Sequence, residues 1–208
     1  MSDVVVLVHG IWMTTLELRP LAWRLQRCGY PCRYFYYPSL RHRPADNARR
    51  LAAYLHQLDA PRIHLVAHSL GGIVLSHLFE QGAAARIGRV VMLGSPLQGS
   101  VVARHLYARR ISRMLLGRAT EAGLLGDAPA WRGEVESGMI AGTRSFGIGQ
   151  FLAPGKLVPP HDGTVAVSET RSPGLHQHRT VHSSHLSMLV SREVADLVCR
   201  FLQQGRFT

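Results

Sequence analysis

Cysteine, lysine and long hydrophobic runs are all scarce in this chain of 208 residues. The three cysteines, Cys28, Cys32 and Cys199, cannot all pair with one another, and their spacing fits no zinc motif. We therefore expect unpaired thiols, a reducing compartment and a cytoplasmic location. The first apolar run, residues 4–8, is too short for a signal-peptide core or a membrane span. It is predicted to be the first strand of the fold.

Acidic residues are also few, at 13 against 24 basic ones, which gives a formal charge of +11. All basic residues except Lys156 are arginines, scattered from Arg19 to Arg206 without aromatic interleaving or a nucleic-acid motif. We therefore expect no nucleic-acid partner. The 12 histidines include no His-Glu-x-x-His set or comparable spacing, so no metal is expected either. The length and the 46% hydrophobic content predict one globular domain over residues 1–208.

The stretch around which the chain is organised is 61–72, Pro-Arg-Ile-His-Leu-Val-Ala-His-Ser-Leu-Gly-Gly. Residues 63–67 form a short apolar run typical of a buried parallel strand, and apolar residues at helical spacing follow from Ile73. Ser69 lies on the sharp turn between them, with the small residues Ala67 and Gly71 two positions to either side. An ordinary Ser-Gly-Gly turn is the alternative. The strand before and the helix after Ser69 favour a nucleophile, whose developing negative charge backbone amides could hold.

The first strand ends in His9-Gly10-Ile11-Trp12, a glycine turn that leaves the next amide free to face a ligand. The plain alternative is a strand-to-helix turn. The position of this His-Gly turn, about 60 residues before the serine, predicts instead an oxyanion hole formed by the Ile11 and Leu70 amides. We also expect Trp12, which follows Ile11, and His68, which precedes Ser69, to contact the substrate.

Strand-like and helix-like segments alternate along the chain. Strands are predicted at 4–8, 33–37, 63–67, 89–93, 139–142 and 179–182, with helices at 16–27, from Pro44, after Ser69 and from Leu186. The alternation predicts an α/β fold with a mostly parallel central sheet of about six strands and helices on both faces. The site is expected beyond the carboxyl ends of the strands.

Residues 101–135 depart from this alternation. Two patterns of apolar residues and arginine at helical spacing, at 101–109 and 110–118, predict a pair of helices. The segment is either a solvated connection or a small lid over the site. Its arginines would suit contact with an anionic lipid surface, so peripheral membrane contact is a further alternative.

A serine nucleophile needs a base and an acid that orients the base. Asp162, in the loop 159–165 after the fifth strand, is the acid that we predict, although an aspartate before glycine is also a common turn residue. His185, between the last strand and the closing helix, is predicted to be the base, with His182 as the alternative. His161, His176 and His178 are expected to be solvated loop residues.

Five blocks of sequence together resemble the α/β-hydrolase lipases and esterases. They are Leu-Val-His-Gly-Ile, Ala-His-Ser-Leu-Gly-Gly, Leu-Gly-Ser-Pro-Leu-Gln-Gly-Ser, His-Asp-Gly-Thr-Val and Ser-Ser-His-Leu. The second is similar to the elbow of small bacterial lipases, and the third resembles the group that contains the GPI inositol-deacylase-like lipases. The resemblance extends from Val4 to Leu189.

This resemblance implies an α/β-hydrolase fold and a carboxylic ester hydrolase that acts on a small-molecule or lipid ester without a cofactor. Ser69 would be the nucleophile, Asp162 the acid, His185 the base, and Ile11 and Leu70 the oxyanion donors. An acyltransferase or thioesterase with the same residues is one alternative. A catalytically idle domain of this fold that serves as a binding module is another.

Overall fold

A computed structural model describes residues 2–83 and 85–208 of the chain. Six strands form one sheet in the order β2-β1-β3-β4-β5-β6, and every neighbouring pair is parallel. The strands are β1 (Val4–Val8), β2 (Cys32–Phe35), β3 (Ile63–His68), β4 (Ile87–Leu93), β5 (Ser137–Gly142) and β6 (Gln177–Val181). The predicted fold class, a largely parallel sheet of about six strands, is confirmed.

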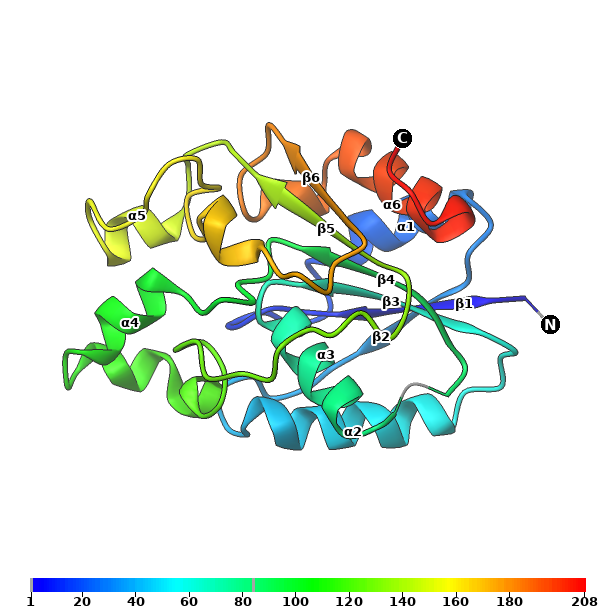
Figure 1. The fold of residues 1–208 in the computed structure, drawn as a ribbon, viewed down its shortest axis with the longest axis horizontal. Coiled ribbons are helices and arrows are strands. Elements are labelled where there is room, and N and C mark those ends of the chain that lie inside the picture. Colours follow the sequence, from blue (N-terminus) through cyan, green and yellow to red (C-terminus); the bar gives the residue numbers. More distant parts are fainter. Residues whose placement is uncertain (1, 84) are drawn as a thin grey trace.

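Helices cover both faces of the sheet, as Figure 1 shows. The face below the sheet in that view carries α2 (Pro44–His56) and α3 (Leu70–Glu80), and the opposite face carries α1 (Arg19–Arg27) and α6 (Arg192–Gln204). The apolar side chains of each strand alternate between the two faces: Val4, Val6 and Val8 join one core, and Val5 and Leu7 join the other. The strands β1 and β3 are therefore buried on both sides and read as continuous apolar runs.

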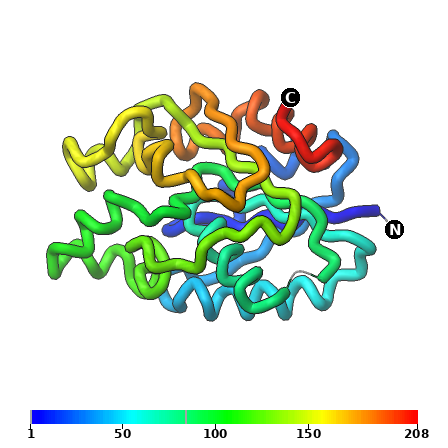
Figure 2. Tube along the Cα trace, viewed as in Figure 1, coloured from blue at the N-terminus to red at the C-terminus, as the bar shows by residue number. Residues whose placement is uncertain are grey.

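The carboxyl ends of the strands meet at one end of the molecule, where the longest connections project (Figures 1 and 2). One of these contains α4 (Val101–Tyr107) and the short 3-10 turns Ser112–Leu115 and Gly117–Thr120. Another contains α5 (Ile148–Leu152), and two further 3-10 turns lie at Val167–Thr170 and Ser187–Leu189. The prediction of a second helix at 110–118 was wrong. The Arg118 amide donates to the Leu40 carbonyl, 2.9 Å away, instead of to a carbonyl four residues earlier in its own turn.

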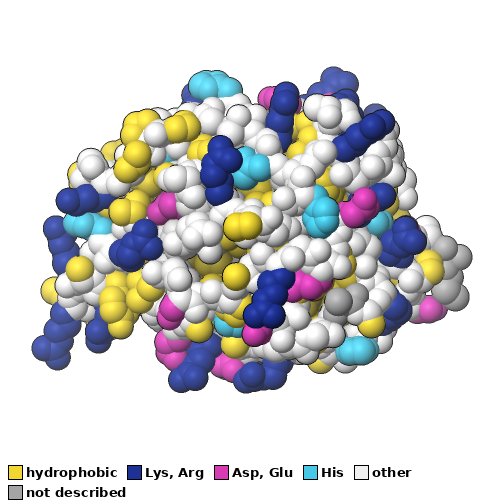
Figure 3. Space-filling view, in the orientation of Figure 1, with side chains coloured by type: hydrophobic (Ala, Val, Ile, Leu, Met, Phe, Trp, Pro, Cys, Tyr) yellow, Lys and Arg dark blue, Asp and Glu magenta, His cyan; other side chains and the backbone are white. Residues whose placement is uncertain are grey.

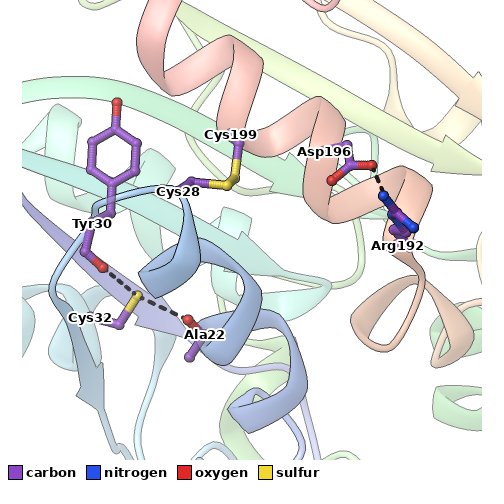
Figure 4. Close-up of a disulfide and its surroundings, with 7 residues drawn as sticks. All are labelled: Ala22, Cys28, Tyr30, Cys32, Arg192, Asp196 and Cys199. Carbon is purple, nitrogen blue, oxygen red and sulfur yellow. Dashed lines mark hydrogen bonds and ion pairs between the residues drawn. A yellow bond between two sulfur atoms is a disulfide. The ribbon is translucent and has the colours of Figure 1, made fainter.

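A disulfide joins Cys28, at the carboxyl end of α1, to Cys199 in α6, as Figure 4 shows. The expectation of unpaired cysteines was therefore wrong for these two, because residues 171 positions apart in sequence meet only once α1 packs beside α6. Cys32 is free and buried, and burial raises the pKa of its thiol to about 12. Disulfides persist in oxidising surroundings, so the cysteine content no longer favours a reducing compartment.

No helix in residues 2–83 or 85–208 is both long enough and apolar enough to cross a membrane.

Candidate active site

Ser69 lies between β3 and α3 in a strained backbone conformation, with φ 53° and ψ −122°. Such a positive φ is uncommon for a residue with a side chain and is retained where the surroundings enforce it. Here a buried strand and a helix buried from Leu70 to Phe79 fix the turn on both sides. A Cβ on Gly71 would lie 2.7 Å from the Val8 carbonyl oxygen, so only glycine allows α3 to approach the end of β1 this closely.

The loop after β1 passes directly beside the serine. A Cβ on Gly10 would lie 3.0 Å from the Ser69 Cβ, and Ile11 lines the same cavity as the serine. The buried His9 holds this loop, because its Nδ1 is 2.8 Å from the Gly10 carbonyl oxygen and the Tyr37 hydroxyl donates to the His9 carbonyl at 2.7 Å. Burial lowers the pKa of His9, so the ring that supports the loop is held neutral.

The two predicted oxyanion donors flank this turn. Leu70 is the first residue of α3, where backbone amides have no partner within the helix. Within the described residues, neither the Ile11 amide nor the Leu70 amide donates a hydrogen bond. Their assignment as oxyanion donors stays a prediction, and the geometry leaves both available.

Asp162 and His185 form a buried pair in which His185 Nδ1 lies 2.6 Å from Asp162 Oδ2. The other carboxylate oxygen accepts the amides of Thr164 and Val165 at 2.9 and 2.7 Å. A second link runs through the backbone, since the His185 amide donates to the Asp162 carbonyl at 2.9 Å. With Nδ1–H bound by the carboxylate, the free nitrogen of His185 is Nε2, which carries the lone pair that a base requires.

Ser69 and His185 line one cavity, but within the described residues no hydrogen bond joins their side chains at 3.5 Å or less. In enzymes without substrate, the contact between nucleophile and base is often long and shortens in the complex. The structure therefore brings all three predicted catalytic residues together, but the hydrogen bond from Ser69 to His185 that proton transfer needs is not formed.

His68 links the serine turn to the histidine loop. Its Nε2 lies 3.0 Å from the backbone oxygen of His185, which can only accept, so Nε2 carries the proton. Burial, followed by the charge of His185, lowers the pKa of His68 to about 3. His68 lines the cavity, but its Nδ1 is buried. His68 is 1% exposed, and its contact with substrate stays a prediction.

The other late histidines lie apart from this cluster. His182 follows β6 with an exposed side chain and makes no hydrogen bond to Asp162 among the described residues. The expectation that His161 is a solvated residue was wrong, because it is buried and its Nδ1 accepts the Gly163 amide at 3.1 Å. It supports the turn that follows Asp162. His176 is exposed as expected, whereas His178 is half-buried in β6.

Glu169 is the other buried carboxylate near the site. It accepts the amides of Val101 and Ala166 and so connects the start of α4 to the loop that carries Asp162. Burial is the largest influence on its pKa, which is raised. It links two loops, and in the described part of the chain no hydrogen bond or ion pair joins it to His185.

An apolar cavity of about 540 Å³ opens over the serine. Trp12 lies on its wall, and its indole N–H donates to the Leu115 carbonyl at 2.6 Å. Its contact with substrate stays a prediction. Sequence reasoning missed Phe146, Ile148 and Phe151, which form another part of the wall. The only signal for them was an apolar residue at 146, 148 and 151, in a stretch for which no helix or strand was predicted. Among the described residues, Glu17 is the carboxylate that lines the cavity.

The described residues contain no group of three or more histidine, cysteine, aspartate or glutamate side chains that could hold a metal ion.

The fold is that of the α/β-hydrolases. A Bacillus licheniformis lipase in its mature form is similar over 99% of this chain and 92% of its own, with 21% identity and a TM-score of 0.78. A metagenomic carboxyl esterase is similar over 98% of this chain and 76% of its own, with 17% identity and a TM-score of 0.66. An extracellular α/β-hydrolase from a Paenibacillus species is similar over 99% of both chains, with 14% identity and a TM-score of 0.59. At these identities the likeness establishes the fold, as the sequence blocks predicted.

The chain belongs to the family described as Domain of unknown function (DUF7379), whose model matches residues 3–139. No curated protein matches the chain.

Proposed function

We propose that this protein is a serine hydrolase that cleaves carboxylic esters through Ser69, His185 and Asp162. The observation that carries the proposal is the shared cavity. A serine on a strained elbow opens into the same apolar space as a histidine whose Nδ1 is held 2.6 Å from a buried carboxylate. The solved structures of a lipase and a carboxyl esterase with this fold support the same class of reaction.

The proposed reaction is acyl transfer to water. His185 Nε2 takes the Ser69 proton as Oγ attacks the ester carbonyl, and the Ile11 and Leu70 amides hold the resulting oxyanion. The protonated His185 then gives its proton to the departing alcohol, leaving the acyl group on Ser69. His185 then takes a proton from a water molecule as the water oxygen attacks the acyl carbonyl, and it returns that proton to Ser69 Oγ as the bond between Oγ and the acyl group breaks and the acid departs. The apolar wall of the cavity suits an uncharged acyl or alcohol chain. No cofactor takes part in any of these steps.

The test is hydrolysis of p-nitrophenyl esters from acetate to palmitate by the wild type and by Ser69→Ala. We expect the variant to lose about four decades or more in kcat/KM with an unchanged circular dichroism spectrum. Ser76→Ala is the matched control, because Ser76 is a buried serine in α3 that does not line the cavity. Full activity in Ser69→Ala would overturn the proposal.

Two alternative functions would use the same geometry, and further assays of the same protein distinguish them. A thioesterase or acyltransferase would prefer an acyl thioester, or would pass the acyl group to an added alcohol faster than to water. An idle binding module would turn over no ester, and Ser69→Ala would change nothing. The hydrogen bond between His185 Nδ1 and Asp162 Oδ2 favours the catalytic alternatives, because a binding module does not need an oriented histidine.

A further inference from the structure

Exposed large apolar side chains are concentrated at the end of the molecule that carries the cavity. All those in the described residues except Trp23 lie in the segments that follow the carboxyl ends of strands. Some form the rim of the cavity itself, such as Phe146, Phe151 and Leu186, which are 67%, 78% and 59% exposed. Exposed apolar residues scattered singly need no explanation, whereas a group at one end indicates a surface that meets something apolar.

The segment 107–115 extends this apolar surface beyond the cavity. Ile111 and Met114 are 86% and 80% exposed and do not line the cavity. The segment is nevertheless anchored, because Leu106 and Leu116 are buried on its inner side and the Trp12 indole donates to the Leu115 carbonyl. The buried anchors therefore keep the exposed side chains of Ile111 and Met114 on the outer side of the segment.

Basic charge accompanies the apolar residues on the same segment. Arg109, Arg110 and Arg113 are exposed, and none of them forms an ion pair within residues 2–83 and 85–208. By contrast, the nearby Arg43 and Arg118 are both paired with Glu121. Figure 3 shows dark blue and yellow side chains beside one another at the left end of the molecule, the end to which the strands of Figure 1 point.

We propose that residues 107–115 and the rim of the cavity together form a docking surface for anionic lipid bilayers. Unpaired arginines would meet the phosphates of the headgroups while Ile111, Met114 and the rim aromatics enter the interface between headgroups and acyl chains. The net charge of +11 adds a general attraction to an anionic surface, and this segment gives the contact its orientation. In that orientation the cavity opens onto the bilayer.

The test is sedimentation with phosphatidylglycerol vesicles and with phosphatidylcholine vesicles, from low to high salt. We expect binding to phosphatidylglycerol at low salt that declines as salt screens the charges, and weak binding to phosphatidylcholine throughout. Replacement of Arg109, Arg110 and Arg113 by glutamine should lower the partition coefficient about fivefold per arginine. Ile111→Ser with Met114→Ser should weaken binding at every salt concentration.

The chain offers a matched control on another face. Trp23 is an exposed aromatic residue in α1 whose ring contacts the guanidinium groups of Arg24 and Arg27. Trp23→Ser with Arg24→Gln and Arg27→Gln removes one apolar and two basic groups away from the cavity, and it should leave vesicle binding close to that of the wild type.

Three results would overturn the inference. They are no binding to phosphatidylglycerol at low salt, equal and salt-independent binding to both lipids, and a loss in the Trp23 control as large as in the arginine variant. The inference does not require the hydrolase activity, because binding is measured equally well with Ser69→Ala. A protein that hydrolyses soluble esters but ignores vesicles would contradict this inference alone, and one that binds vesicles but cleaves nothing would contradict the proposed function alone.

Discussion

Two segments at the same end of the molecule differ sharply in how they are held. The elbow consists of buried residues from β3 to Phe79 of α3, and this packing keeps its serine at a strained φ beside the cavity. The segment 107–115 is anchored on one side and otherwise exposed. A group that must meet a reacting atom needs placement within a fraction of an ångström, whereas a surface that meets a soft partner does not. Substitutions in the two segments should therefore affect different measurements.

The largest expected effect concerns the base that serves the elbow serine. His185→Ala should lose about four decades or more in kcat/KM, and the double variant with Ser69→Ala should be hardly worse than either single one, because the residues act as a unit. His182→Ala, at an exposed position three residues earlier, should retain activity. If His182→Ala carries the loss instead, the assignment of the base is wrong.

Gly71 tests how tightly the elbow is packed. In Gly71→Ala the new Cβ would meet the backbone oxygens of Val8 and His9 at 2.7 and 2.9 Å, and neither can move without shifting β1. We expect a loss of about 1–3 kcal/mol in the free energy of unfolding, measured with denaturant, and a lower kcat. Gly82→Asn is the control at the other end of α3. Its φ of 76° tolerates asparagine and nothing lies within 4 Å, so an equal loss there would contradict the argument.

The buried histidines of the elbow region predict a pH dependence of stability. His68 has a folded-state pKa of about 3, and burial also lowers the pKa of His64. Between pH 6.5 and 3 the unfolded chain binds protons that the folded chain does not, so stability falls as the pH falls through this window. His68 alone should cost about 2 kcal/mol at pH 5 relative to pH 7. In His68→Gln, the free energy of unfolding measured with denaturant should fall by about 2 kcal/mol less between pH 7 and pH 5 than in the wild type. An equal fall in both proteins would contradict the lowered pKa of His68.

The smallest effect is expected in the exposed segment. Ile111→Ser with Met114→Ser should change the free energy of unfolding by no more than about 0.5 kcal/mol, since both side chains are already in water. Thermal denaturation of this double variant and of Gly71→Ala, measured side by side, checks this expectation. A large loss in the double variant would mean that the segment is packed against something, and the contrast with the elbow would disappear.

The structure around the elbow could be predicted from the sequence better than that of the exposed segment. Buried parallel strands and the serine turn leave strong local patterns, so the six strands were found within a few residues of their bounds, and Asp162 and His185 were placed at the same edge. Residues 110–118 carry a helical pattern but fold into 3-10 turns, because a tertiary contact from Arg118 to Leu40 replaces a helical hydrogen bond. The Cys28–Cys199 bond and the aromatic wall at Phe146 and Phe151 depend on packing between distant segments, which no local pattern records.

The bond between Cys28 and Cys199 closes 172 of the chain's residues into a covalent ring, since the two ends are 171 positions apart and both are counted. All three proposed catalytic residues and the whole exposed segment 107–115 lie inside that ring. A protease that cuts after Arg109, Arg110 or Arg113 would therefore open the loop without releasing either piece, so the nicked protein should run as one species until it is reduced and as two afterwards. A cut in this exposed segment would leave Ser69, His185 and Asp162 joined in a single molecule.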